Sequence, residues 1–279
     1  MSELTGGAAG DVAVITGGAG GIGFALAQAY AQRGARVLIA DRDLERLAAA
    51  AERLAATGAE VHHHRVDLVD EASVDELAAF AGGVGRIGAL CLNAGITSSG
   101  PTTWNTSPAT FDAVIGVNLR GLFNSIRSFV PGLVAQGGPA SIVITASMAG
   151  LVASGYSAVY AASKAGAVAL AKALRDELAN EAPAVSVALL CPGVVRTDLM
   201  RTSSAVLTGD AAMDPTFADI GHQALNEAGV APHEAARWAL DALDEGRFWA
   251  VPPAGDGFTE LLRAELATIE GALGAPSPS

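Results

Sequence analysis

The sequence predicts an α/β fold, in which helices cover both faces of a Rossmann-like, doubly wound parallel sheet of seven strands. Two observations carry this prediction. Short β-rich runs alternate with Ala-rich helical stretches from one end of the chain to the other, and a glycine-rich turn follows the first run. The chain shows no internal repeat and no linker, so we expect residues 1–279 to form one domain.

The alternation places each element in turn. The expected strands lie near residues 11–16, 36–40, 60–66, 88–93, 140–146, 185–191 and 247–251. The expected helices lie near residues 22–33, 44–56, 74–81, 109–135, 160–179, 233–244 and 258–273. The alternation of strands and helices stops between residues 196 and 231. A stretch of that length is usually a lid or a binding loop, or else it is mobile. We expect residues 198–231 to form a substrate loop.

Composition narrows the range of partners. The chain has 17 basic and 29 acidic residues, a net charge of −12, and no basic cluster, which argues against nucleic acid or an anionic membrane. Residues 128–163 lack charge, but Pro and Gly interrupt them, so we interpret them as core and pocket wall and not as a membrane span. The first residues lack the pattern of a secretory signal, so we expect a cytoplasmic protein with a small-molecule substrate.

The glycine-rich turn has the sequence TGGAGGIG, residues 16–23, directly before a helix. Glycines there let the backbone approach a pyrophosphate, which the helix N-terminus then stabilises, although a simple tight turn would look the same. Gly18, Gly20 and Gly23 satisfy one dinucleotide motif, while Gly17, Gly21 and Gly23 satisfy another.

The second expected strand ends at Asp41, where an acid that binds the adenosine ribose is expected. A carboxylate there would repel a 2′-phosphate, so NAD is favoured over NADP. Arg42 could instead bind a 2′-phosphate. Alternatively, both residues could simply cap the strand end.

The segment VYAASKAG, residues 159–166, places Tyr160 and Lys164 four residues apart on one helical face. Only two of the 17 basic residues are lysines, which makes the pair unusual. Tyr156 also lies four residues before a polar partner, but that partner is Tyr160, which supplies no positive charge.

These motifs resemble the classical short-chain dehydrogenase/reductase family over residues 11–197. The match includes the glycine turn, VDL at 66–68, NAG at 93–95, VNL at 117–119, a serine thirteen residues before Tyr160, the Tyr160–Lys164 pair and CPGVVRT at 191–197. The resemblance selects the register of Gly17, Gly21 and Gly23. The NAD-binding residues that it implies are Gly17, Gly21, Ile22, Gly23, Asp41, Arg42, Asp67, Leu68, Asn93, Ala94, Gly95, Tyr160, Lys164, Pro192, Gly193, Val195 and Thr197.

The implied chemistry interconverts a secondary alcohol and a ketone, with catalytic residues Asn118, Ser147, Tyr160 and Lys164. Tyr160 would relay the proton, and Ser147 would hold the substrate oxygen. Bringing the Tyr160 pKa from about 10 to about 7 requires about 4 kcal/mol. A Lys164 ammonium about 4 Å away would supply that much at an effective dielectric near 20, and would also bind the ribose. Asn118 would hold a water that links Lys164 to solvent.

The substrate pocket should be lined by the segment after Asn93, by residues 148–156 and by residues 198–231. Its expected apolar lining is Met148, Leu151, Val152, Leu199, Met200, Val206 and Leu207, and the expected substrate-binding residues are Ser147, Met148, Leu151, Tyr160 and Leu199. Such a lining favours a neutral, bulky or aromatic substrate. A diol or sugar dehydrogenase, which would need a polar group such as Ser154 in the pocket, and a non-catalytic NAD-sensing or scaffold protein stay as alternatives.

The last expected strand and helix depart from many relatives. Together with residues 115–139 they resemble a branch that includes lignin-type aryl-alcohol Cα-dehydrogenases. The resemblance implies a homodimer or homotetramer, and it separates Cys91 and Cys191 by a strand, so no disulfide is expected. His62, His63 and His64 alternate faces on a strand near the sheet edge, so we expect no metal site.

Overall fold

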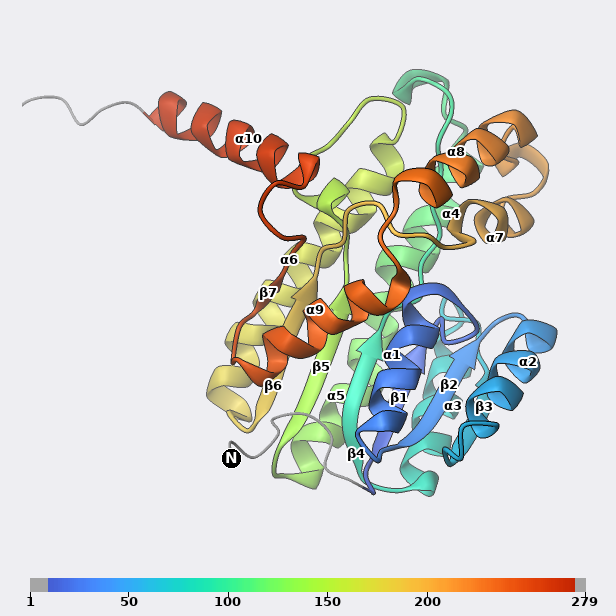
Figure 1. Cartoon of the computed structure of the whole chain (residues 1–279), viewed down its shortest axis with the longest axis vertical. Coiled ribbons are helices and arrows are strands. Elements are labelled where there is room, and N and C mark those ends of the chain that lie inside the picture. The colour runs from blue at the N-terminus through green and yellow to red at the C-terminus, as the bar shows by residue number, and fades with distance from the viewer. Residues whose placement is uncertain (1–9, 274–279) are drawn as a thin grey trace, which may run out of the picture.

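A computed structural model describes residues 10–273 and confirms the predicted α/β architecture. Seven strands form one parallel sheet in the order β3-β2-β1-β4-β5-β6-β7, as Figure 1 shows. The strands are β1 Val12–Thr16, β2 Arg36–Asp41, β3 Val61–Arg65, β4 Ile87–Leu92, β5 Ala140–Thr145, β6 Val185–Leu190 and β7 Trp249–Ala250. The order reverses on either side of β1, which opens a crevice at the carboxyl ends of β1 and β4.

Helices cover both faces of the sheet, and further helices lie beyond the carboxyl ends of its strands (Figure 1). They are α1 Gly21–Gln32, α2 Leu44–Ala55, α3 Glu71–Val84, α4 Pro108–Ile115, α5 Gly121–Gln136, α6 Ala158–Glu181, α7 Leu199–Val206, α8 Pro215–Ala228, α9 Pro232–Asp244 and α10 Gly257–Leu273. Short turns of 3₁₀-helix lie at Thr103–Asn105, Met148–Gly150 and Gly209–Ala211, and a π-helical turn lies at Gly116–Arg120.

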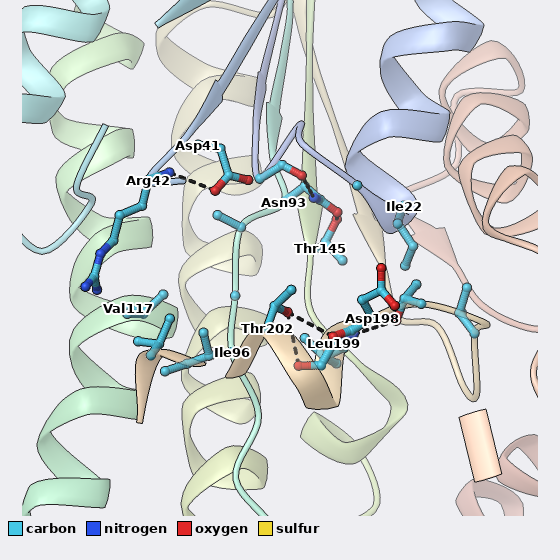
Figure 2. A pocket seen from close by; sticks show the side chains of 18 of the residues that line it. Ile22, Asp41, Arg42, Asn93, Ile96, Val117, Thr145, Asp198, Leu199 and Thr202 are labelled. Atoms are coloured by element: carbon cyan, nitrogen blue, oxygen red, sulfur yellow. Dashed lines mark hydrogen bonds between the residues drawn. The ribbon is translucent and has the colours of Figure 1, made fainter. Parts of the chain in front are cut away.

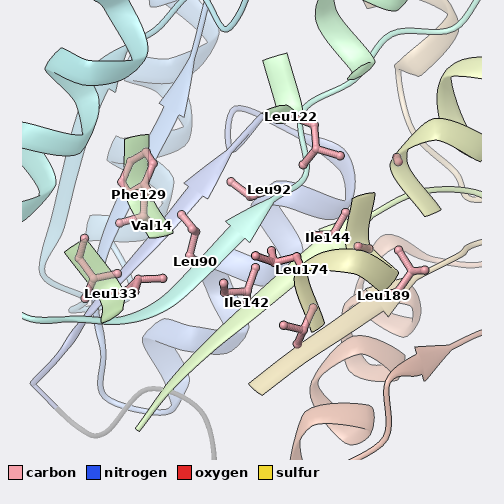
Figure 3. Close-up of a cluster of buried hydrophobic side chains, with 14 of the residues drawn as sticks. Val14, Leu90, Leu92, Leu122, Phe129, Leu133, Ile142, Ile144, Leu174 and Leu189 are labelled. Atoms are coloured by element: carbon pink, nitrogen blue, oxygen red, sulfur yellow. The ribbon is translucent and has the colours of Figure 1, made fainter. Parts of the chain in front are cut away.

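The central strands β1, β4 and β5 are buried on both faces, so neighbouring residues of one strand enter different cores. Val14 faces the core under α3, α5 and α6, whereas Ile15 faces the core under α1, α2 and α9. Figure 3 shows the first of these cores, where Phe129 and Leu133 of α5 pack over Leu90 of β4 and Ile142 of β5. The apolar runs of the sequence are therefore central strands of an α/β sheet.

Three elements differ from the sequence-based expectation. The expected helix at 109–135 is interrupted by the π-helical turn Gly116–Arg120. The stretch 198–231, expected as a loop, holds α7 and α8, which pack around a small separate core that includes Ile96, Met200 and Met213. The expected strand at 247–251 is reduced to β7, because this edge strand pairs with β6 at only two positions.

The cysteines and the histidine run lie in different parts of the sheet. Cys91 and Cys191 are both free and buried, on β4 and just after β6, with β5 between these strands. The three histidines lie on β3, at the sheet edge, and no group of three or more His, Cys, Asp or Glu side chains in the described part of the chain could hold a metal ion. None of the helices described here is long and apolar enough to cross a membrane.

Candidate active site at the carboxyl ends of the strands

A cavity of about 860 Å³ opens at the carboxyl ends of the central strands. The glycine turn after β1, the ends of β2, β4, β5 and β6, the start of α6 and helix α7 surround it (Figure 2). We refer to residues 198–231, which hold α7 and α8, as the lid. This is the crevice at which the strand order reverses, the usual ligand site of a doubly wound sheet.

The glycine turn is shaped for close approach of a ligand. Gly17 and Gly21 have φ values of +66° and +54°, in the left-handed region that favours glycine. A Cβ on Gly23 would lie 2.2 Å from the carbonyl oxygen of Gly17, so the start of α1 can pack on the turn only without a side chain there. Gly20, Gly21 and Ile22 at the start of α1 line the cavity, and this cradle fits a dinucleotide diphosphate.

Asp41 ends β2 with its carboxylate at the cavity wall. Oδ1 accepts hydrogen bonds from the backbone N–H groups of Arg42 (2.8 Å) and Asp43 (3.2 Å). Oδ2 accepts only a long bond of 3.4 Å from the Ala19 N–H. Asp41 therefore does cap the strand end, through Oδ1, while Oδ2 keeps the capacity to accept further hydrogen bonds in the cavity. Arg42 extends away from it along the wall towards Val117 in Figure 2.

Asn93 ties together the ends of three strands beneath the cavity. Its backbone N–H and side-chain Nδ2 donate to Oγ1 and the carbonyl oxygen of Thr16, at 3.0 and 3.2 Å. Its Oδ1 accepts a bond of 3.1 Å from Thr145 Oγ1, drawn in Figure 2. Asn93 thus joins β1, β4 and β5 and holds the cavity floor rigid.

Ser147, Tyr160 and Lys164 all line the same cavity. Ser147 follows β5 and its Oγ accepts a hydrogen bond of 3.1 Å from the Ala149 N–H. Lys164 is only 4% exposed, and its Nζ donates a bond of 3.0 Å to the Thr145 carbonyl oxygen. The Lys164 Nζ lies 5.9 Å from the centroid of the Tyr160 ring.

The electrostatics of this group differ from the expectation. Burial raises the pKa of Tyr160 above its ordinary value, and a hydrogen bond with Ser147 only partly opposes this. Burial also lowers the pKa of Lys164 to about 8. Without a cofactor the pKa of Tyr160 is therefore not lowered towards 7 as expected, because burial is the larger effect. In the cofactor-free protein the tyrosine is held as a neutral phenol.

Asn118 lies beside the cavity and not in its wall. Within the π-helical turn it is 3% exposed, its Oδ1 accepts from the Ile96 N–H, and its Nδ2 donates to the Ile96 carbonyl oxygen, both at 2.8 Å. Nδ2 also donates to Ser163 Oγ at 2.9 Å. These bonds fix the segment after β4 against α6, and the water-holding role stays a prediction.

Most of the expected cofactor-binding residues line the cavity, and Gly23 lies behind the turn. At the substrate end, Ser147, Tyr160, Leu199 and Val206 line it as expected. Met148 does not: the 3₁₀-turn after Ser147 directs its side chain into the main core, where it is 0% exposed. The remaining expected lining residues outside the wall are Leu151, Val152, Met200 and Leu207.

The wall also contains apolar residues that the sequence analysis did not name, three of them inside the segments expected to line the pocket and one, Val117, outside them. These are Ile96, Val117, Ala205 and Leu225. Leu199, Thr202, Ala205 and Val206 recur at helical spacing, which was the one available signal that α7 turns a face to the cavity.

Comparisons with known proteins agree with this geometry. Residues 11–207 match the family model for short chain dehydrogenases. The chain is 40% identical over 219 residues to the 1-deoxy-11-beta-hydroxypentalenate dehydrogenase of Streptomyces avermitilis, covering 75% of this chain and 80% of that protein. It is 28% identical over 250 residues to the C alpha-dehydrogenase of a Sphingobium species, covering 86% and 80%.

A solved structure extends the match to the whole fold. A short-chain dehydrogenase/reductase from Burkholderia phymatum, solved in complex with NAD, superimposes with a TM-score of 0.88 at 31% identity, covering 100% of this chain and 99% of that one. On the family match, the relatives and the site, the chain belongs to the short-chain dehydrogenase/reductase family and is an oxidoreductase of alcohol- or ketone-type substrates.

Proposed function

We propose that this enzyme uses NAD to interconvert a bulky, neutral and largely apolar secondary alcohol and its ketone. The observation that carries the proposal is the convergence of Ser147, Tyr160 and Lys164 on one cavity wall that also includes the glycine turn. Two cysteines that are both free fit the cytoplasm as its compartment.

The side chains divide the work of alcohol oxidation. When bound, the nicotinamide accepts or donates the hydride. Ser147 holds the substrate oxygen, and the Tyr160 phenolic oxygen takes or returns its proton. Because burial raises the Tyr160 pKa in the free protein, the relay depends on positive charge that arrives with the oxidised cofactor beside Lys164.

The preference for NAD rests on Asp41. Its Oδ2 carries only one long hydrogen bond and lines the cavity, so it can accept the ribose hydroxyls. A 2′-phosphate in the same place would meet a carboxylate of like charge. The related Burkholderia phymatum enzyme was solved with NAD, which supports the same choice.

The substrate end favours an apolar molecule. Leu199, Val206 and Leu225 of the lid line the cavity together with Arg201 and Thr202, and its apolar part suits bulky hydrocarbon rings. The names of the two relatives, a hydroxypentalenate dehydrogenase and a C alpha-dehydrogenase, are consistent with that class.

Two alternatives are weaker. A diol or sugar dehydrogenase would need Ser154 in the pocket, but the Ser154 hydroxyl bonds Ser157 and lies outside the cavity wall. A non-catalytic NAD-binding protein would have no use for a buried Lys164, whose charge is costly to keep.

We also propose that the protein is a homodimer or homotetramer. Helix α10 stands apart from the body in Figure 1, and Leu261, Leu266, Ile269 and Leu273 on it are 49–81% exposed. Large apolar side chains gathered on one helix mark an interaction surface.

The proton relay is tested by Tyr160→Phe. We expect NADH binding, followed by fluorescence titration, to be kept, while turnover of apolar secondary alcohols with NAD falls by about a thousandfold. Tyr156→Phe is the matched control, because Tyr156 is 64% exposed and outside the wall. A Tyr160→Phe enzyme with near-normal turnover would refute the assignment.

Cofactor choice is tested by titrating NADH and NADPH. We expect NADH to bind at least about tenfold more tightly, and Asp41→Ser to narrow that ratio by weakening NADH and admitting NADPH. Tighter binding of NADPH by the unaltered enzyme would overturn the role given to Asp41.

Lys164 and Lys172 lie on the same helix, so substituting each of them tests how a buried lysine affects the free energy of unfolding. The pKa of Lys164 is about 8 in the folded protein against 10.5 as its ordinary value, a difference of about 3 kcal/mol. Below pH 8, Lys164 is protonated in both the folded and the unfolded state, so the folded state is destabilised by the full cost of burying the charge. This cost disappears gradually between pH 8 and 10.5, and it is absent at higher pH. Losing the bond to Thr145 offsets about 1 kcal/mol.

We therefore expect Lys164→Met to raise the free energy of unfolding of the cofactor-free protein by about 2 kcal/mol at pH 7, and to lose that gain by about pH 10.5. Lys172→Met, at an exposed position of the same helix, should change little at either pH. Urea unfolding at several pH values measures both. Equal destabilisation by Lys164→Met at pH 7 and pH 10.5 would contradict the buried-charge argument.

Oligomerisation is tested by Leu266→Glu, which places a charge among the exposed apolar residues of α10. Light scattering after gel filtration should show a smaller assembly than for the unaltered chain, whereas Thr268→Glu on the same helix serves as the control for added charge. A monomeric unaltered protein would rule out this proposal.

A further inference from the structure

An ion pair links the adenosine side of the cavity to the lid. Arg46 lies in the first turn of α2, directly after the strand end that carries Asp41, and Asp198 immediately precedes α7. Arg46 Nη2 lies 3.8 Å from Asp198 Oδ2, and the two side chains are 37% and 58% exposed. Both residues line the main cavity and the smaller adjoining one, so the pair lies where the two cavities meet.

Arg46 also lies directly over the glycine turn. A Cβ on Gly20 would lie 2.8 Å from Arg46 Nη2. In the described structure no side chain caps the start of α1 at Gly20, and the first turn of α1 contains no acid. The positive end of the α1 dipole and the Arg46 guanidinium therefore face the same small volume, where an anion would be stabilised by both.

Asp198 shows that this volume attracts a carboxylate. An aspartate that precedes a helix usually accepts a hydrogen bond from the first-turn N–H groups. Among the described residues Asp198 makes no such bond, and the Leu199 N–H is instead bonded to Thr197 Oγ1 at 3.3 Å. In Figure 2 the Asp198 carboxylate points from the lid towards the start of α1, where Ile22 lies.

We propose that Arg46 binds the diphosphate of the dinucleotide, and that Asp198 is an internal competitor that takes this place in the cofactor-free chain. The inference rests on the proposed NAD cofactor. A half-exposed ion pair contributes at most about 1 kcal/mol, so a diphosphate that also engages the α1 amides displaces Asp198 readily. Cofactor binding then breaks the link between α2 and the lid.

Arg42 is not placed to bind the diphosphate in the way proposed for Arg46. Figure 2 shows its side chain running along the other side of the cavity towards Val117, away from Asp198. Arg53 offers the better comparison, since it lies on α2 seven residues after Arg46 and lines the smaller adjoining cavity. Its guanidinium packs 4.2 Å over the Phe24 ring.

Binding of NADH and NADPH, measured by fluorescence and calorimetry, tests the proposal without any turnover. We expect Arg46→Gln to raise the Kd of both by about tenfold and to weaken its dependence on salt, because a charge-assisted bond to the shared diphosphate is lost. Arg46→Lys should recover part of the affinity, and Arg53→Gln should leave both Kd values unchanged.

Asp198→Asn should change the Kd of NADH in the opposite direction. Removing the competitor should lower the Kd of NADH by about two- to fivefold. In the double variant Arg46→Gln/Asp198→Asn this gain should vanish, because Asp198 then has no guanidinium to compete for. Additive effects of the two substitutions would overturn the competition.

The remaining outcomes separate this inference from the proposed function. Normal NADH binding by the unaltered chain with an unchanged Kd in Arg46→Gln overturns the role of Arg46 alone. A loss confined to NADPH assigns Arg46 to the 2′-phosphate and also overturns it. An unaltered chain that binds neither dinucleotide overturns the proposed cofactor and this inference together.

Discussion

The Lys164 ammonium is buried against the end of β5, and the arrangement of the active site depends on how that charge is accommodated. Its Nζ reaches the Thr145 carbonyl oxygen at 3.0 Å, which requires α6 to lie close to β5. A Cβ on Gly150 would lie 2.6 Å from the Lys164 carbonyl carbon, and one on Gly95 would lie 3.2 Å from Nζ. Gly150 and Gly95 are therefore needed to make room for Lys164. The same approach brings Tyr160, one helical turn earlier, to the cavity wall.

The burial of this charge also explains why the site is incomplete without its cofactor. Burial raises the pKa of Tyr160 and lowers that of Lys164, so both shifts favour the neutral forms. A relay that needs a phenolate and an ammonium is thus disfavoured in the free protein. Positive charge beside Tyr160 would favour its phenolate, so we expect a bound oxidised cofactor to oppose the effect of burial there.

The fold and most of the cavity wall could be predicted because they follow from local sequence. Buried parallel strands read as apolar runs, and residues that follow strand ends, such as Asp41, Asn93 and Ser147, meet at one edge of the sheet. Met148 was misplaced because a single 3₁₀-turn after Ser147 decides which way its side chain points. The π-helical turn at Asn118 adds a residue to a turn that helical periodicity cannot reveal. The lid helices depend on packing against Ile96 and Val114, which are distant in sequence.

Because the chain is strongly negative, binding of a negatively charged dinucleotide depends on the charged groups close to the glycine turn. A protein with a net charge of −12 must attract a dinucleotide whose diphosphate is itself negative. At physiological ionic strength the Debye length is about 8 Å, so distant acids are largely screened and groups within a few ångströms decide the outcome. Near the turn those groups include the α1 amides and the Arg46 guanidinium, with Asp198 and Asp41 as nearby acids. Because Asp198 immediately precedes α7, the exchange of anions that admits the diphosphate also breaks the ion pair between α2 and the lid, while the lid helices stay packed on their own core.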